Sequence, residues 1–395
     1  MRRFCTESVL AMIVRHFLQW VRTATAGERA DATGALARAY LYADLSVDDR
    51  AAAEGAMVML LDDPSPLVRG ALAEALAGSA DAPPAIVLAL AADQPDIAVI
   101  VLERSPLLLD ADLVDTVGGG NASAQAAVAR RPGLPCAVAA AIAEVGSAEA
   151  CLLLIENPDA TLAPFSLDRI VERFGHLAAI REAMLADEEL PSSTRQALVV
   201  KLSETLAHFV SAREWLARPR AERVAREACE KATVALAAET AAPQVRPLVT
   251  HLRKSGQLTA GLVLRALLSG NMALFEEALA ELAELPLARV VSLVYDRSGK
   301  GLRALFERAG MPSAVYPAVR AALDLIHETG FAGDVGGHTR LKRRMVERVL
   351  TQCERLGRDA DSDALLILLR RFALEATREE ARMFCDELAA EELAA

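Results

Sequence analysis

The sequence predicts an all-α protein built as a HEAT-like α-solenoid, in which antiparallel helix pairs stack on one another. Hydrophobic residues make up 53% of the 395 residues and aromatic residues only 4%, so the core must come from Ala, Leu and Val, as in packed helices. No segment alternates with the period of two that marks a strand. Helix-start residues recur at intervals of 31, 25 and 26 residues, at Ser65, Asp96, Asn121 and Ser147. Together these features indicate a helical repeat.

Residues 1–30 are expected to form an N-terminal amphipathic helix. Its apolar positions follow helical spacing, at Leu10, Ile13, Val14, Phe17, Leu18 and Val21. We expect this helix to cap the array or to contact a second copy in a homodimer, because the end of a repeat stack must be covered. Nearby arginines leave an alternative, in which it lies on an anionic membrane surface. Arg15 and His16 interrupt the apolar run, so a secretory signal is not expected.

Residues 31–190 are expected to hold the repeats. In the clearest unit Ser65 is the predicted N-cap and Pro66 the first helical residue, where its missing N–H costs nothing. The helix that follows has apolar residues on one stripe and ends at Gly78. Asp96, Asn121 and Ser147 are the predicted caps of later units.

Residues 60–69 (LLDDPSPLVR) resemble the turn within a HEAT repeat. That resemblance implies a ladder in which an aspartate near the turn and an arginine after a valine join neighbouring repeats. Arg69 is the candidate arginine. The equivalent positions in the next units are Ile100 and Ala163, so a continuous ladder is not predicted.

A second resemblance covers most of the chain. It is to an uncharacterised, mostly alphaproteobacterial HEAT-like family known only as a domain of unknown function. Four segments carry it: 127–131 (AVARR), 152–157 (LLLIEN), 256–265 (GQLTAGLVLR) and 270–275 (GNMALF). The family implies helical repeats and brings no reaction, cofactor or catalytic residue.

Residues 191–329 are expected to contain longer helices and then a second repeat region. The long helices are predicted at Ser193–Leu216 and Ala221–Ala238, as a hairpin broken at Pro219, with a boundary at 240–247 where two prolines interrupt the periodicity. Thr259 is a predicted N-cap. Another helix is expected at Met272–Leu285, with an apolar face that includes Leu279.

The last two segments are a Gly-rich linker at 330–338 and C-terminal helices at 339–395. Thr339 is the predicted cap of the first of these helices.

Composition excludes several kinds of function. The net charge of −11 argues against general binding to nucleic acid, which needs a cationic face. The six histidines include no pair at i, i+4 and the six cysteines no Cys-x-x-Cys, so no metal site or disulfide framework is expected. We expect the cysteines to be small buried residues in a cytoplasmic protein. No apolar run is long enough to span a membrane.

The Gly-rich motifs are weak candidates for phosphate binding. In 298–301 (SGKG) the hydroxyl residue of a P-loop is replaced by Gly301 and no strand precedes it, so a turn between helices is expected. Gly118–Gly120 is expected to be a loop before the Asn121 cap. The histidines at 327 and 338 form a local cluster that is expected to be ordinary helix-end and loop residues.

Two basic clusters could dock an acidic partner, because opposite potentials raise encounter rates. The first is on a predicted C-terminal helix and comprises Arg340, Lys342, Arg343, Arg344 and Arg348. The second surrounds Trp215 and comprises Arg213, Arg218, Arg220, Arg223 and Arg226. The alternative is that both are solvated faces balanced by neighbouring glutamates.

The sequence therefore predicts a non-catalytic scaffold or adaptor that presents a helical-repeat surface to a protein partner of unknown identity. No cofactor is expected. The alternative is a sensor of a small anion or nucleotide, on which the Gly-rich linker would close. A remote alternative is an enzyme like the HEAT-like DNA glycosylases, which would need a cationic groove with aromatic residues.

Overall fold

The computed structural model describes residues 20, 23–296, 299–329, 341–355 and 360–394, and within these every regular element is a helix. The all-α prediction is thus confirmed. The chain divides into two compact units, Met1–Glu188 and Glu189–Ala395. Most of the predicted N-terminal helix, the linker at 330–338, Thr339 and Arg340 lie outside the described residues.

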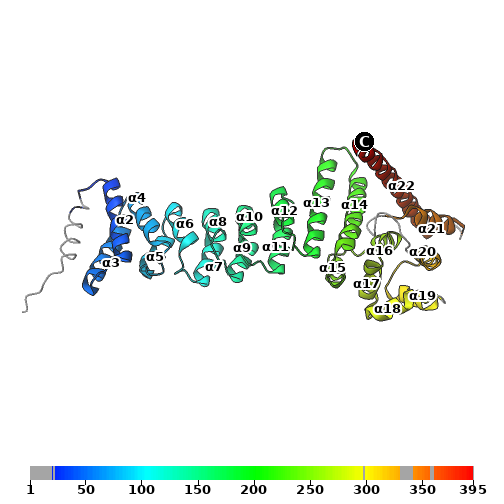
Figure 1. The fold of residues 1–395 in the computed structure, drawn as a ribbon, viewed down its shortest axis with the longest axis horizontal. Coiled ribbons are helices and arrows are strands. Elements are labelled where there is room, and N and C mark those ends of the chain that lie inside the picture. Colours follow the sequence, from blue (N-terminus) through cyan, green and yellow to red (C-terminus); the bar gives the residue numbers. More distant parts are fainter. Residues whose placement is uncertain (1–19, 21–22, 297–298, 330–340, 356–359, 395) are drawn as a thin grey trace, which may run out of the picture. The chain divides into compact units, whose positions relative to one another are not determined.

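The first unit is a stack of short helices (Figure 1). Their bounds are α2 Ala26–Tyr42, α3 Val47–Leu61, α4 Pro66–Leu76, α5 Pro84–Ala91, α6 Pro95–Arg104, α7 Asp110–Gly119, α8 Ala122–Ala129, α9 Cys136–Val145, α10 Ala148–Glu156, α11 Pro164–Phe174 and α12 Ala178–Leu185. The even-numbered helices pack in succession from α2 to α12, and α7, α9 and α11 pack likewise in a second row. This arrangement is that of an α-solenoid. The predicted segment boundary at residue 30 falls inside α2.

Local sequence determines where most of these helices begin. Asn121 and Ser147 are N-caps whose side chains accept from the backbone N–H of Ala124 and Ala150. Ser65 occupies the N-cap position before Pro66, but its side chain makes no capping hydrogen bond. The prediction of Asp96 as a cap is wrong. Pro95 is the first helical residue, which moves Asp96 into the first turn, where its charge still favours the helix N-terminus.

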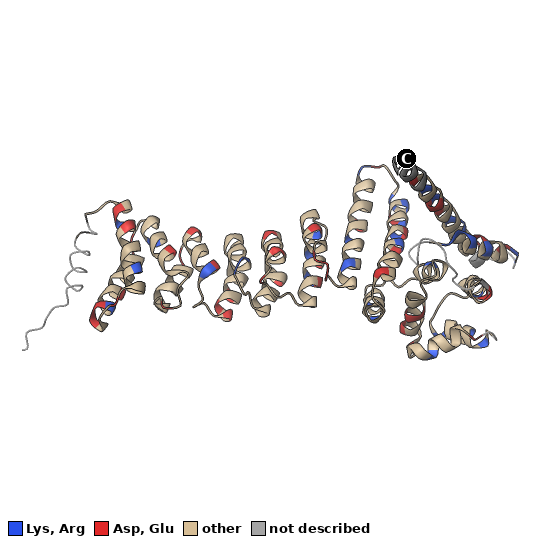
Figure 2. Cartoon of the chain, in the orientation of Figure 1, with Lys and Arg blue, Asp and Glu red and all other residues tan. Residues whose placement is uncertain are grey.

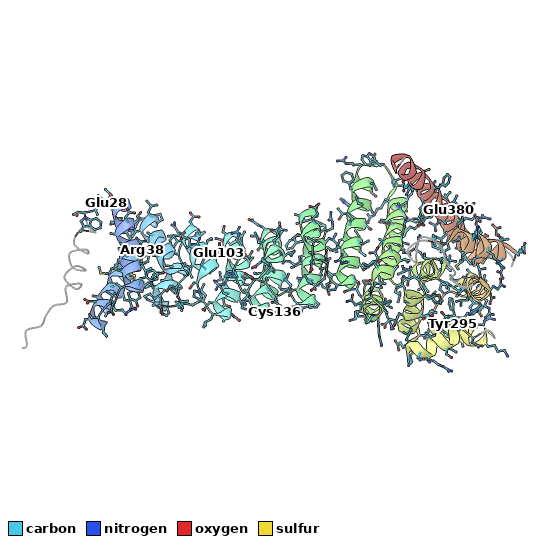
Figure 3. The ribbon with its side chains drawn as sticks, viewed as in Figure 1. Glu28, Arg38, Glu103, Cys136, Tyr295 and Glu380 are labelled. Carbon is cyan, nitrogen blue, oxygen red and sulfur yellow. The ribbon has the colours of Figure 1, made fainter. Side chains whose placement is uncertain are left out.

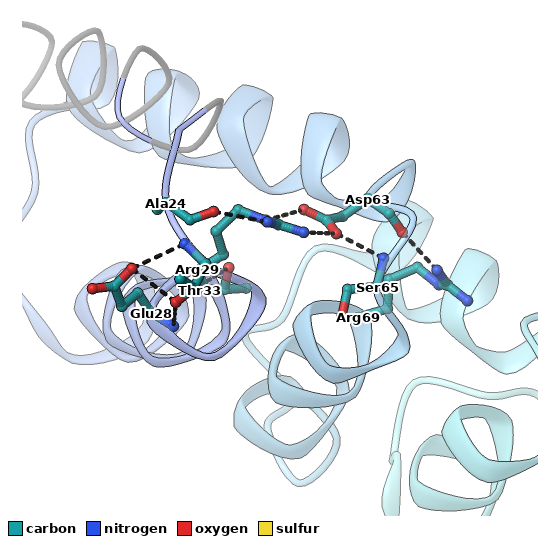
Figure 4. Close-up of polar contacts among 8 residues, drawn as sticks. Ala24, Glu28, Arg29, Thr33, Asp63, Ser65 and Arg69 are labelled. Atoms are coloured by element: carbon teal, nitrogen blue, oxygen red, sulfur yellow. Dashed lines mark hydrogen bonds and ion pairs between the residues drawn. The ribbon is translucent and has the colours of Figure 1, made fainter.

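Arginine–aspartate pairs join the first three layers of the stack, and Figure 4 shows the contacts of Asp63 with Arg29 and Arg69. Arg29 of α2 donates two hydrogen bonds of 2.8 Å to the Asp63 carboxylate, which also accepts from the backbone N–H of Ser65. Arg69 donates to the Asp63 carbonyl at 2.6 Å and grips Asp93 with two hydrogen bonds. Arg29 lowers the pKa of Asp63 below its ordinary value, despite the opposing effect of burial.

Beyond Asp93 the connections between layers change partner. Arg131 donates to the carbonyls of Leu102 and Ser105 at the end of α6, and Arg173 donates to those of Ala143 and Gly146 at the end of α9. These carbonyls belong to last turns that lack partners within their own helix. Arg131 and Arg173 therefore cap a helix of the preceding layer, whereas Arg29 and Arg69 each bind an aspartate carboxylate.

The second unit begins with two long helices, continues with shorter ones and ends with a helix of 35 residues (Figure 1). Their bounds are α13 Ser192–Ala212, α14 Arg218–Glu239, α15 Ala242–Lys254, α16 Ala260–Leu268, α17 Met272–Ala283, α18 Leu287–Val294, α19 Lys300–Arg308, η1 Ser313–Val315, α20 Tyr316–Thr329, α21 Arg343–Arg355 and α22 Ala360–Ala394. Thr259 caps α16 as predicted, accepting from the N–H of Leu262.

Two predictions about prolines in this unit are wrong. Pro219 does not break the hairpin, because it lies in the first turn of α14 and the chain reverses at 213–217. Pro243 and Pro247 do not mark a boundary either. Pro243 lies in the first turn of α15 and Pro247 inside the same helix. A proline in a first turn loses no hydrogen bond, so it favours a helix start.

A single apolar core joins α14 to α22. Its centre is α16, in which every residue from Leu262 to Leu268 is buried, and α17, which contributes Phe275 and Leu279. One of the buried residues of α16 is charged. Arg265, with 3% of its side chain exposed, donates 2.7 and 2.9 Å hydrogen bonds to Glu375 of α22 and lies over the Phe372 ring. Further pairs, Lys231 with Glu379 and Arg371 with Glu227, join α22 to α14.

The cysteines do not all behave as predicted. Cys151, Cys229 and Cys353 are buried, but Cys136, labelled in Figure 3, and Cys385 are exposed. Cys136 is the first residue of α9 and so faces outward at a helix end. Burial raises the pKa of Cys151 and of Cys353 to about 11. None of the described helices is long and apolar enough to cross a membrane.

Candidate functional site

A cleft of about 910 Å³ runs along the α13–α14 hairpin. One wall is α13, which contributes Val200, Ser203, Glu204, Ala207, His208 and Ser211. The other wall is α14, with Arg218, Glu222, Ala225, Arg226 and Cys229. The turn between α15 and α16 completes the lining with Gly256, Gln257 and Thr259.

Small residues line the α13 side of this cleft. Ser203, Ala207 and Ser211 recur every four residues on α13 and so share one face. Ala225 faces the cleft from α14. Twelve residues separate the two ends of the α13 wall, Val200 and Ala212, which corresponds to a length of about 18 Å. The cleft is therefore elongated along the helices.

Charges line the cleft in both signs. Arg218 donates a 2.8 Å hydrogen bond to Glu222 one turn later on α14, and both are exposed. Glu204 faces the cleft from α13 and Arg226 from α14. Figure 2 shows blue and red segments along α14, whereas α13 is mostly tan. A ligand in this cleft would meet the Glu204 carboxylate on the α13 wall and charges of both signs on the α14 wall.

Beside the cleft, polar groups that are buried or half-buried bind one another. Thr259 donates a 2.7 Å hydrogen bond to Glu230, whose pKa is raised because burial outweighs that hydrogen bond. Burial also raises the pKa of Cys229, so its thiol stays protonated near neutral pH. His251 and Gln196 pair at 3.2 Å. The described residues hold no group of three His, Cys, Asp or Glu that could bind a metal ion.

The end of the hairpin carries the second basic cluster that the sequence predicts. Arg213 lies over the ring of Phe209 at 4.2 Å and over that of Trp215 at 5.4 Å, and the two rings meet edge to face. Glu214 completes the turn with a positive φ of 59°. The structure thus places Arg213 and Trp215 together, and it puts Arg218 and Arg226 along the adjacent cleft.

The other predicted docking cluster, at residues 340–348, has most of its described arginines in ion pairs. Arg343, Arg344 and Arg348 are exposed on α21 and Lys342 is half-buried. Their charge is largely balanced: Arg343 pairs with Glu347 and with Glu380, which is labelled in Figure 3, and Arg348 pairs with Glu328. Arg340 lies outside the described residues. The cluster remains a prediction, but its pairs leave less net charge for a partner than its sequence suggests.

The Gly-rich motifs lie at helix ends. Gly299, with a φ of 71°, is the N-cap of α19, and its carbonyl accepts from the Tyr316 hydroxyl. Gly118 and Gly119 end α7, and Gly120 leads to the Asn121 cap. His327 of α20 lies against the Tyr295 ring, and His338 lies outside the described residues.

A protein-family model described as "uncharacterised protein conserved in bacteria" (DUF2336) matches residues 97–359, well over half of the chain. The chain belongs to this family. The match includes the whole α13–α14 hairpin and all four segments that carry the resemblance. No curated protein and no solved structure matches the chain.

Sequence reasoning found the long helices and the arginines around Trp215 but missed the cleft. The signal that could have revealed it is the run of small residues at 203, 207 and 211. In an isolated helical hairpin such a stripe favours close packing, so the presence of an open cleft depends on how the two helices diverge, which composition does not determine.

Proposed function

We propose that this DUF2336 protein is a non-catalytic adaptor whose α13–α14 cleft binds a helical segment of a protein partner. The observation that carries the proposal is the cleft itself: an elongated, open cavity of about 910 Å³ along two long helices, lined by small and by charged side chains. A groove of about 18 Å accommodates about three turns of a helix. Helix-in-groove recognition uses this kind of surface, with apolar anchors spaced three and four residues apart.

Electrostatics supports a partner with charges of both signs. Arg226 and Arg218 on the α14 wall would face acidic side chains of the bound helix, and Glu204 on the α13 wall would face a basic one. Such complementarity contributes more to specificity than to affinity.

The proposal is tested by filling the cleft without disturbing the hairpin. Ala225 lines the cleft, whereas Ala228, three residues later on α14, is exposed and does not line it. Ala225→Trp is expected to remove the partner from crosslinking and affinity capture in extracts of the native organism. Ala228→Trp is the matched control and is expected to leave recovery unchanged. Equal recovery with both variants would contradict a role for the cleft.

A sensor of a small anion or nucleotide is the second candidate, and Arg218 and Arg226 in the same cleft favour it. A ligand at about 100 times its Kd stabilises the folded state by about 2.7 kcal/mol. A thermal-shift screen of nucleotides and signalling phosphates would therefore detect it. A shift that Ala225→Trp abolishes would support the sensor over the adaptor.

A further inference from the structure

The outer half of the α13–α14 hairpin has almost no core of its own. From residue 199 to residue 228 the only buried residue is Ala221. Large apolar side chains remain exposed there: Leu206 at 53%, Phe209 at 43%, Trp215 at 63% and Val224 at 49%. Two helices packed only on each other cannot cover their apolar faces. This end of the hairpin therefore presents an apolar surface that nothing in the described chain covers.

The exposed apolar residues surround the end of the hairpin and do not follow one stripe. Leu206 and Phe209 are on α13, Trp215 is in the turn, and Val224 is on α14. Leu206 lies six residues before the end of α13, and Val224 six residues after the start of α14. At 1.5 Å per residue, both lie within about 9 Å of the helix ends. This matches the depth of about 5–10 Å to which amphipathic segments enter a lipid interface.

Basic residues flank this apolar end. Between residues 213 and 223 there are four arginines and two glutamates, a local excess of positive charge in a chain whose net charge is −11. One of the glutamates, Glu222, already pairs with Arg218. Arg213 lies against Phe209 and Trp215, so cationic and aromatic groups form one cluster. Trp and Arg together are typical of residues that occupy the headgroup region of a membrane.

We infer that the end of the α13–α14 hairpin inserts into an anionic lipid surface. Phe209 and Trp215 then lie at the boundary between the headgroups and the acyl chains. Arg213, Arg220 and Arg223 lie among the headgroups. A fluid interface fits better than a protein pocket, because the apolar side chains project from both helices and from the turn. A lipid surface can surround such an end on all sides. This inference goes beyond the adaptor proposal, since none of these five side chains lines the adjacent cleft.

The test uses the full chain and vesicles of phosphatidylcholine that contain about one third phosphatidylglycerol. We expect the wild-type chain to co-sediment with these vesicles but not with phosphatidylcholine alone. Phe209→Ser combined with Trp215→Ser, and Arg220→Glu combined with Arg223→Glu, should each need about tenfold more lipid for half-saturation. All four side chains are exposed, so an unchanged Tm checks that each variant is folded.

Matched controls distinguish vesicle binding by the hairpin end from nonspecific binding by other exposed aromatic or basic residues. Phe165→Ser with Phe384→Ser removes two aromatic side chains that are each 62% exposed elsewhere. Arg343→Glu with Arg344→Glu makes the same charge change on α21. Both controls should bind vesicles like the wild type, and so should Ala225→Trp, which fills only the cleft. Loss of binding in the controls equal to that in the hairpin variants would overturn the inference.

Fluorescence places the contact directly. Trp20→Phe leaves Trp215 as the single tryptophan of the chain, and its emission should shift to shorter wavelength on adding the anionic vesicles. No vesicle binding by the wild type overturns the inference. If light scattering instead shows a dimer that Phe209→Ser with Trp215→Ser abolishes, without vesicle binding, the surface binds a second copy. If the chain binds polyglutamate but not vesicles, the hairpin end is a binding surface for an acidic polypeptide.

Discussion

The repeat stack of the first unit and the α13–α14 hairpin are both made of paired helices, yet they use their surfaces in opposite ways. In the stack, each even-numbered helix from α4 to α10 packs against the even-numbered helices before and after it, and arginines join the layers. In the outer hairpin, thirty residues bury a single alanine. A long helix that extends past its neighbours thus leaves its apolar residues exposed.

The largest expected effect comes from placing a charge in either core. Leu72 in the first unit and Leu279 in the second are fully buried. Leu72→Asp and Leu279→Asp should each destabilise their own unit by about 4 kcal/mol or more, because a buried unpaired carboxylate is costly. Thiol labelling followed by mass spectrometry can locate the effect. Cys151 reports on the first unit and Cys353 on the second, and burial protects both in the folded chain.

Leu72→Asp should expose Cys151 and leave Cys353 protected, and Leu279→Asp should do the reverse. If both thiols became reactive together in either variant, the two units would unfold as one. Unchanged protection of Cys151 in Leu72→Asp would show that the apolar face of α4 is assigned incorrectly.

A medium effect is expected from the buried ion pair of the second unit. Glu375→Ala leaves Arg265 buried without its carboxylate, which should cost about 3 kcal/mol in denaturant unfolding. The comparison is Glu74→Ala in the stack, where the pair with Arg104 is more than half exposed on both sides. That variant should lose about 0.5 kcal/mol or less. Similar losses in the two variants would contradict the contrast between a buried and an exposed pair.

The smallest effect concerns pH and the Asp63 pairs of the stack. The Arg29 guanidinium holds the pKa of Asp63 below its ordinary value of 3.8, so the pair stabilises the folded state above that pH and is lost as pH falls through the lower, folded value. Asp63→Asn should cost about 1–2 kcal/mol at neutral pH. Its stability should then fall less than that of the wild type when the pH is lowered from about 5 to about 2. Denaturant unfolding at each pH measures this, and parallel pH curves for the two chains would refute the assignment.

The sequence predicts features that local chemistry decides. The caps Asn121, Ser147 and Thr259 form as expected, because an N-cap depends on its own side chain and the next three residues. Asp96 failed for an equally local reason, since the proline before it is the better first helical residue. The rule that a proline in a first turn starts a helix, applied to Pro66, would also have corrected Pro219.

Features that depend on tertiary packing were out of reach. Arg265 follows the pattern of an exposed polar residue, but α16 is buried on every side and α22 supplies Glu375 from 110 residues away. The pairing of Arg343 and Arg348 likewise requires α20 and α22 to lie against α21. Sequence spacing shows which residues share a helix face and gives no information about which helix covers it.

The backward-reaching arginines of the stack have a consequence for synthesis on the ribosome. Arg131 caps carbonyls 26 and 29 residues earlier, and Arg173 caps carbonyls 27 and 30 residues earlier. A nascent chain therefore completes the end of α6 or α9 only after the following layer has left the exit tunnel. Assembly of this part of the stack should advance one layer behind translation, because the arginine of each new layer caps a helix end of the layer before it.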